Sequence, residues 1–258
     1  MFGLRRHLGG TIVAAIVLAS CTGVTRNRVA APHSSASSTR SSPPISIAQT
    51  PTPVAVATTL PAVFKGAVSA LPGWLVERMR GTTWRPGCPV PLRDLRLLSL
   101  RYWGFDGRVH QGPMVVNASV ARDVVFAFRR IFQAHFPIKI LHLTHRYVPS
   151  HEDPNDKRDW TASFNCRVAV TARGPRTNWS QHAYGLAIDI NPMQNPYVTS
   201  DGYIFDYHAR RYRDRSLHLP GMIHPGDAVV RAFEAIGWTW AGTWSHDKDY
   251  MHFSQNGH

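Results

Sequence analysis

Two segments of the chain carry the apolar spacing of a surface helix. Between residues 120 and 136, apolar side chains recur every three or four positions, and Asn117 or Ser119 can serve as the N-cap. Residues 228–236 repeat this spacing over a shorter stretch. The pattern predicts a helix over each range, with Pro137 ending the first because proline cannot continue a helix.

Other segments alternate between apolar and polar positions, as strands do. Residues 138–143 alternate in the manner of a strand, and residues 186–190 place Asp189 on the face opposite three aliphatic side chains. Residues 251–253 set His252 between two apolar neighbours. These patterns predict an α+β domain in which a small antiparallel sheet forms a cleft and the helices pack on the other face of the sheet.

The first sixty residues differ in composition from the rest. Two arginines precede a short apolar run, and this run ends in Leu-Ala-Ser-Cys21. Residues 1–21 therefore have the features of an export signal. The apolar run within them is too short to span a bilayer as a helix. Residues 22–61 are rich in Ser, Thr, Ala and Pro and predict a disordered tether. The folded domain is then expected within residues 62–258.

The sequence around Cys21 resembles the lipobox of bacterial lipoproteins, in which cleavage leaves the cysteine as the lipidated first residue. Lipidation at Cys21 would anchor the chain to the outer face of the cell membrane. The alternative is cleavage by ordinary signal peptidase, which would discard Cys21 and release a secreted protein. Both interpretations predict an extracytoplasmic location.

The charge balance restricts the partners. The formal net charge is +13, and five of the 29 basic side chains but none of the 16 acidic ones lie in residues 1–60. A basic surface suits any polyanion, so composition alone admits nucleic acid or an anionic cell envelope. Because the N-terminus predicts export, we expect no nucleic-acid partner.

Two distant stretches contain side chains that commonly bind metal ions. The first holds His182 and Asp189, and the second holds Asp249 and His252. Two imidazoles and one carboxylate suit a three-ligand zinc shell with one position open for water, and a second carboxylate could act as a base beside it. Taken singly, each residue is more often a surface, core or capping residue. Their combination favours a catalytic zinc site.

Two further cysteines, Cys88 and Cys166, form an even pair in a chain that we expect to be exported. A disulfide between them is the natural interpretation, and two buried thiols are the alternative.

Specific motifs resemble a known family. The pattern S-x-H-x-x-G-x-A-x-D at residues 180–189, followed by D-x-x-H-F at residues 249–253, is similar to zinc peptidases that cut bacterial peptidoglycan. These are the D-alanyl-D-alanine carboxypeptidase family, in the group that also contains lysostaphin-type enzymes and the hedgehog signalling domain. The stretches Phe-Asn-Cys-Arg at residues 164–167 and Ile-Asn-Pro at residues 190–192 resemble actinobacterial members.

The resemblance implies a role for each matching position. It implies one Zn²⁺ ion held by His182, Asp189 and His252. It also implies that Asp249 is the catalytic base and that Arg167 contacts the substrate or the developing oxyanion. Ser180 matches a serine of the family motif and is expected to contact the substrate. His246 and Asp247 are also close in sequence, but their spacing to His252 does not match the family.

The function implied is hydrolysis of a peptide bond in the peptidoglycan stem peptide, of the D-alanyl-D-alanine carboxypeptidase or L-alanyl-D-glutamate endopeptidase type. Within this group strict carboxypeptidases tend to use glutamate as the base, so Asp249 favours an endopeptidase. Residues 159–163 depart from the family pattern, so the rim of the cleft is expected to differ. The alternative is a catalytically inactive wall-binding module on the same fold, for which loss of the base or of a ligand would be the signature.

Overall fold

The computed structural model describes residues 62–144, 159–171, 174–204 and 206–257. The export signal, Cys21 and the tether expected over residues 22–61 lie outside these ranges. Among the described helices, none is long and apolar enough to cross a bilayer.

A long hairpin forms the largest sheet. Strands β2 (Leu95–Trp103) and β3 (Val109–Asn117) pair along their whole length, and β1 (Gly66–Ala70) pairs antiparallel with the outer edge of β2. Side chains on one face of the hairpin, such as Leu98 and its cross-strand partner Met114, are completely buried. Sequence patterns did not predict this hairpin.

Helix α2 (Ala121–Gln133) confirms the first predicted helix. A short 3₁₀ turn, η2 (Ala118–Val120), precedes it, and the Asn117 side chain caps this turn by accepting from the Ser119 amide at 3.0 Å. The helix ends before Pro137, as expected, but it ends three residues before the predicted boundary.

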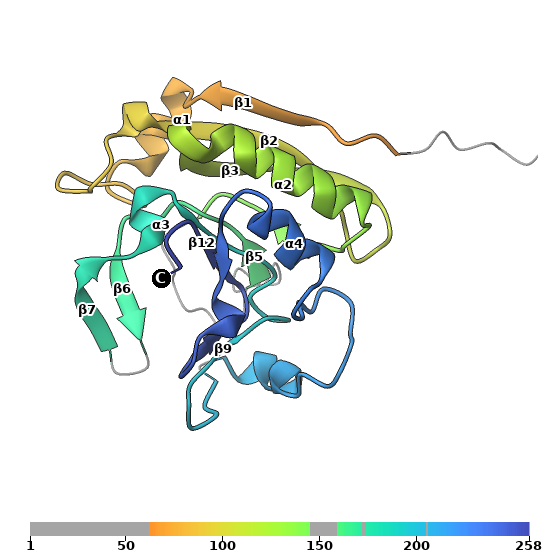
Figure 1. Ribbon diagram of the computed structural model, residues 1–258. Helices are drawn as coiled ribbons and strands as arrows, with labels where there is room; N and C mark the ends of the chain where they lie inside the picture. The colour runs from red at the N-terminus through yellow and green to blue at the C-terminus, as the bar shows by residue number, and fades with distance from the viewer. Residues whose placement is uncertain (1–61, 145–158, 172–173, 205, 258) are drawn as a thin grey trace, which may run out of the picture. The chain divides into compact units, whose positions relative to one another are not determined.

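The second predicted helix is α4 (Ala228–Glu234), which packs against α2. The Phe128 ring of α2 meets the Phe233 ring of α4 edge to face, with centroids 6.4 Å apart. Figure 1 shows α2 lying along the β2–β3 hairpin, with α4 on its other side. The main hydrophobic core lies between the hairpin and these two helices.

A small antiparallel sheet contributes side chains to the same core. Its strands are ordered β10 (Thr239–Trp240), β12 (His252–Ser254) and β8 (Ala187–Asp189). Ile188 and Phe253 point from this sheet into the core, and the Phe253 ring stacks on Phe233 at 4.3 Å. The α+β class and the helices on one face of a small antiparallel sheet are therefore confirmed.

The remaining elements are short. The strand expected over residues 138–143 is reduced to β4 (Ile140–Leu141), which pairs parallel with β5 (Trp160–Thr161). The others are α1 (Gly73–Met79), η1 (Leu92–Asp94), β6 (Val168–Thr171), β7 (Gly174–Trp179), α3 (Gln181–Tyr184), β9 (Tyr197–Val198), η4 (Tyr207–Arg213), η5 (Ala241–Thr243) and β11 (Lys248–Asp249).

The predicted disulfide is present. Cys88 and Cys166 are bonded and lie in a second hydrophobic cluster with Leu75 and Met79 of α1. The bond joins the loop after α1 to the segment directly before Arg167. It therefore fixes one edge of the cleft described next.

Candidate metal centre

Asp189 and His252 lie directly opposite each other on paired strands. The register of β8 and β12 aligns their Cα atoms, and His252 Nδ1 lies 3.1 Å from Asp189 Oδ1. Their strand neighbours Ile188 and Phe253 point into the core. Because side chains alternate along a strand, burying those two neighbours turns Asp189 and His252 to the opposite face of the sheet.

His182 reaches the same point from the short helix α3. The Ser180 hydroxyl caps this helix by accepting from the His182 amide at 3.3 Å. Gly185 ends the helix with φ +67°, and a Cβ at this position would lie 2.6 Å from the Asn117 amide nitrogen. Only glycine suits this turn, because the backbone is left-handed and closely packed.

A backbone contact fixes the orientation of the His182 ring. Its Nδ1 donates to the Ser163 carbonyl at 2.7 Å, so Nε2 of the neutral imidazole carries a lone pair. This Nε2 lies 3.2 Å from Asp189 Oδ2 and 3.2 Å from His252 Nδ1. Two imidazole nitrogens and a carboxylate thus converge, and the ligand atoms of the three side chains lie within 4.8 Å of one another.

This arrangement fits a transition-metal ion. Bonds of about 2.0–2.2 Å to a common ion, at angles between right-angled and tetrahedral, separate ligand atoms by about 2.8–3.6 Å. The observed separations of 3.1–3.2 Å lie inside this range. Because electron-rich atoms in such close contact repel one another, a cation between them would stabilise the cluster.

Burial and mutual charge set the protonation of the cluster. Burial lowers the pKa of His182 below its ordinary value, even though Asp189 opposes this effect. Burial alone would raise the pKa of Asp189, but His182 and then His252 together hold that pKa well below the ordinary value. The cluster therefore presents a neutral imidazole beside an ionised carboxylate, which is the protonation state that metal ligands need.

The cluster lies in a cavity of about 430 Å³. The hairpin of β6 and β7 forms one wall, and the segment from Trp244 to Asp249 forms the other. Besides the three clustered side chains, the cavity is lined by Arg167, Ala169, Val170, Arg176, Asn178, Trp179, Ser180, Gln181, Tyr197, Trp244, Ser245, His246, Asp247 and Asp249. All six site residues named from the sequence are thus brought to one cavity.

Asp249 differs from the other carboxylates of the cavity. Pairing of β11 with β9 places it opposite Tyr197, and its Oδ1 atom is buried with no hydrogen-bond partner among the described residues. Burial raises the pKa of Asp249 to about 7; His252 opposes this rise and Asp189 adds to it. Asp249 thus offers a free acceptor oxygen inside the cavity.

Asp247, the nearby competitor, is already engaged. One of its oxygens accepts from the Tyr197 hydroxyl, and the other accepts from the Ser200 amide at 2.9 Å. His246 is exposed at the rim. The structure therefore keeps Asp249 as the better candidate for a base.

Arg167 and Ser180 lie side by side on the backbone. The Ser180 amide donates to the Arg167 carbonyl at 3.1 Å, and Arg167 Nη1 donates to the Val168 carbonyl at 3.3 Å. Arg167 also lines the cavity. Ser180 has a structural task as the cap of α3, which sequence reasoning did not foresee.

Sequence reasoning missed two parts of the cavity wall. The hairpin of β6 and β7, which contributes Arg176, pairs a short Val-Ala-Val-Thr strand with a polar strand, and neither alternates clearly between apolar and polar positions. Tyr197, which holds Asp247, carried no signal beyond its place in an Asn-Pro-Tyr stretch. Trp238 and Trp240 are core residues, whereas Trp244 lines the cavity.

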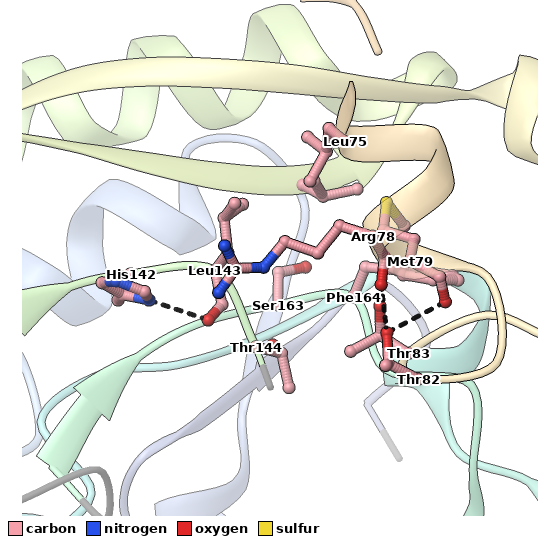
Figure 2. A pocket seen from close by; sticks show the side chains of 11 residues that line it. Leu75, Arg78, Met79, Thr82, Thr83, His142, Leu143, Thr144, Ser163 and Phe164 are labelled. Carbon is pink, nitrogen blue, oxygen red and sulfur yellow. Dashed lines mark hydrogen bonds between the residues drawn. The ribbon is translucent and has the colours of Figure 1, made fainter. Parts of the chain in front are cut away.

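A second, much smaller cavity lies near α1. Figure 2 shows Leu75, Met79 and Phe164 on one side and Thr144 and Ser163 among the polar residues that line it. Its volume of about 20 Å³ is enough for about one water molecule. It therefore cannot admit a substrate, and the larger cavity is the candidate functional site.

Comparison with known proteins agrees with this location. The sequence profile of a family described as D-alanyl-D-alanine carboxypeptidase matches residues 173–255. His182, Asp189, His252 and Asp249 lie within that match, whereas Arg167 precedes it. Searches among curated proteins and among solved structures returned no match. The match supports assignment of this segment to a peptidase family with a site compatible with a metal ion.

Proposed function

We propose that the protein is a zinc-dependent peptidase that hydrolyses a peptide bond in the stem peptide of bacterial peptidoglycan. The observation that carries this proposal is the convergence of His182, Asp189 and His252 in one cavity that also holds the unpaired carboxylate oxygen of Asp249. The family match over residues 173–255 supports the same reaction class.

The proposed ligands are His182 Nε2, His252 Nδ1 and the Asp189 carboxylate. A zinc ion bound there would polarise the scissile carbonyl and make a water molecule more acidic. Iron is a competing ion for two imidazoles and a carboxylate, so the identity of the metal is part of the proposal.

Asp249 is the proposed general base. Its buried Oδ1 atom would accept a proton from the attacking water and then deliver it to the leaving amine. In the metal-free site burial raises the pKa of Asp249 to about 7, and a bound dication would lower that pKa again, so the carboxylate would be ionised and able to accept a proton.

Arg167 is proposed to stabilise the negative charge that develops on the carbonyl oxygen, or to hold a carboxylate of the substrate. Ser180 is proposed to contact the substrate in addition to capping α3. Both residues line the cavity beside His182, which supports these roles.

The finer substrate assignment rests on the type of base. Because Asp249 is an aspartate, we favour an L-alanyl-D-glutamate endopeptidase over a D-alanyl-D-alanine carboxypeptidase. We further propose that the protein acts outside the cytoplasmic membrane, anchored through a lipid at Cys21, and that it has no nucleic-acid partner.

Digestion of purified muropeptides, followed by mass spectrometry, tests this function. The wild-type protein should release fragments whose masses identify the bond that is cut. Asp249→Ala should lose this activity by about 10²–10⁴-fold while keeping its zinc. His182→Ala should lose both activity and zinc. Full activity in both variants, or activity that resists strong chelators, would contradict the proposal.

A further inference from the structure

The hairpin of β6 and β7 presents a second arginine to the cavity. Arg176 and Asn178 are two positions apart on β7 and both line the cavity, whereas Thr177 between them does not. Ala169, Val170 and Trp179 line the same wall. The wall therefore combines apolar surface with the cationic side chain of Arg176.

The Arg176 guanidinium has no hydrogen-bond or ion-pair partner among the residues that the structure describes, and its side chain is exposed. The carboxylates of the cavity have other neighbours, since Asp189 faces two histidines and Asp247 accepts from Tyr197. A planar guanidinium with free donors is suited to bind a carboxylate from a ligand.

The position of Arg176 separates it from the metal cluster. The Ser180 amide binds the Arg167 carbonyl, so these two residues are level across the hairpin. Arg176 precedes Ser180 by four positions, but a bulge places Pro175 and Trp179 opposite Val170 and Val168, which are only two positions apart. Arg176 is therefore offset from Ser180 by two to three residues of extended chain, or roughly 7–10 Å. An extended peptide bound along this wall would bring a residue two or three positions from the scissile bond to Arg176.

We propose that Arg176 is a specificity-determining residue that binds a carboxylate of the substrate two or three residues away from the scissile bond. The cavity would then prefer stem peptides with free carboxylates to peptides in which those groups are amidated. This inference rests on the proposed function, because it assumes that a stem peptide occupies the cavity. It adds a contact that is distinct from the one proposed for Arg167.

The expected effect is moderate. A charge-assisted pair at an exposed position contributes less than a buried one, because water screens both partners. We expect the pair to change kcat/KM by about 10-fold. The effect should fall as salt is added, since the charges are exposed.

Two synthetic stem peptides test this proposal. They share the same sequence and termini, but their interior carboxylates are free in one peptide and carboxamides in the other. The wild-type protein should hydrolyse the free-acid peptide with about 10-fold higher kcat/KM. Arg176→Gln should bring this ratio close to one by slowing only the free-acid peptide. Arg176→Lys should keep part of the preference.

Thr177→Ala is the matched control on the same strand and should leave the values for both peptides unchanged. An Arg176→Gln variant that keeps the preference, or that slows both peptides equally, would overturn the inference. Dissociation constants for the same two peptides separate this failure from that of the proposed function. If neither peptide is cut but tighter binding of the free acid is lost in Arg176→Gln, the carboxylate site stands and the proposed reaction falls.

Discussion

Replacing Asp249 with asparagine should stabilise the metal-free protein at alkaline pH. The wild-type carboxylate has a buried oxygen with no hydrogen-bond partner among the described residues, and burial raises its pKa to about 7. Ionising this group in the folded state is therefore unfavourable. The side-chain amide introduced by Asp249→Asn cannot ionise, so the substitution removes this cost.

The sign of the effect follows from the protons bound in each state. Below about pH 4 the carboxyl is protonated in both the folded and the unfolded chain, so it costs nothing. Between about pH 4 and pH 7 the unfolded chain releases this proton and the folded chain keeps it, so wild-type stability falls as pH rises. Above about pH 7 the full cost remains.

The size of this cost has an upper bound. The gap between the ordinary value of 3.8 and a pKa of about 7 corresponds to about 4 kcal/mol, because one pH unit equals about 1.4 kcal/mol. Asp249 is half-buried, so solvent screens part of this energy, and the new amide must find its own partners. We therefore expect a gain of about 1–2 kcal/mol at pH 8 and almost none at pH 4.5.

Urea denaturation at pH 4.5 and pH 8, with a chelator present throughout, measures this difference in the free energy of unfolding. Asp247→Asn is the control, because the Asp247 carboxylate accepts from Tyr197 and Ser200. That variant should be destabilised. Equal stability of Asp249→Asn and wild type at pH 8, or a gain that is the same at both pH values, would refute the reasoning.

Two further substitutions test the scaffold of the site. Gly185→Ala should lower the free energy of unfolding by more than about 2 kcal/mol in thermal or urea denaturation, because the backbone there is left-handed and the new methyl would meet the Asn117 amide; a neutral effect would contradict the described turn. Replacing Cys88 and Cys166 together with serine should cost roughly 2–5 kcal/mol in the same measurement. A reducing agent should then destabilise the wild type and leave the double variant unchanged.

Local patterns were sufficient to predict α2 and α4. The apolar spacing extends over the 13 residues of α2 and the seven of α4, and both helices bury that face in the core. The disulfide followed from the even number of cysteines expected after export. These features depend on composition and on neighbours close in sequence.

The long hairpin was missed because its first strand, β2, does not alternate cleanly. In β2 the run Leu-Arg-Leu-Leu-Ser-Leu places leucines on both faces, and both faces contact apolar clusters. The Gly-Phe-Asp-Gly turn at residues 104–107 was the available signal. The hairpin of β6 and β7 carried no such signal, since residues of both strands line an open cavity instead of a core.

For the site, motif spacing named the right side chains but could not explain why they meet. Asp189 and His252 converge because the register of β8 and β12 aligns them, and that register depends on residues 63 positions apart. The Ser163 carbonyl that orients His182 is also distant in sequence and is a backbone group. Such contacts leave no pattern in side-chain identity.

The location of a bound ion is the most direct test of whether His182, Asp189 and His252 form a metal site. Crystals grown with zinc, with diffraction data collected on both sides of the zinc absorption edge, would show where a zinc ion binds. The account predicts one ion per chain, about 2.0–2.2 Å from His182 Nε2, His252 Nδ1 and an Asp189 oxygen. An empty cluster at saturating zinc, or an ion that binds elsewhere and leaves these three side chains untouched, would contradict it.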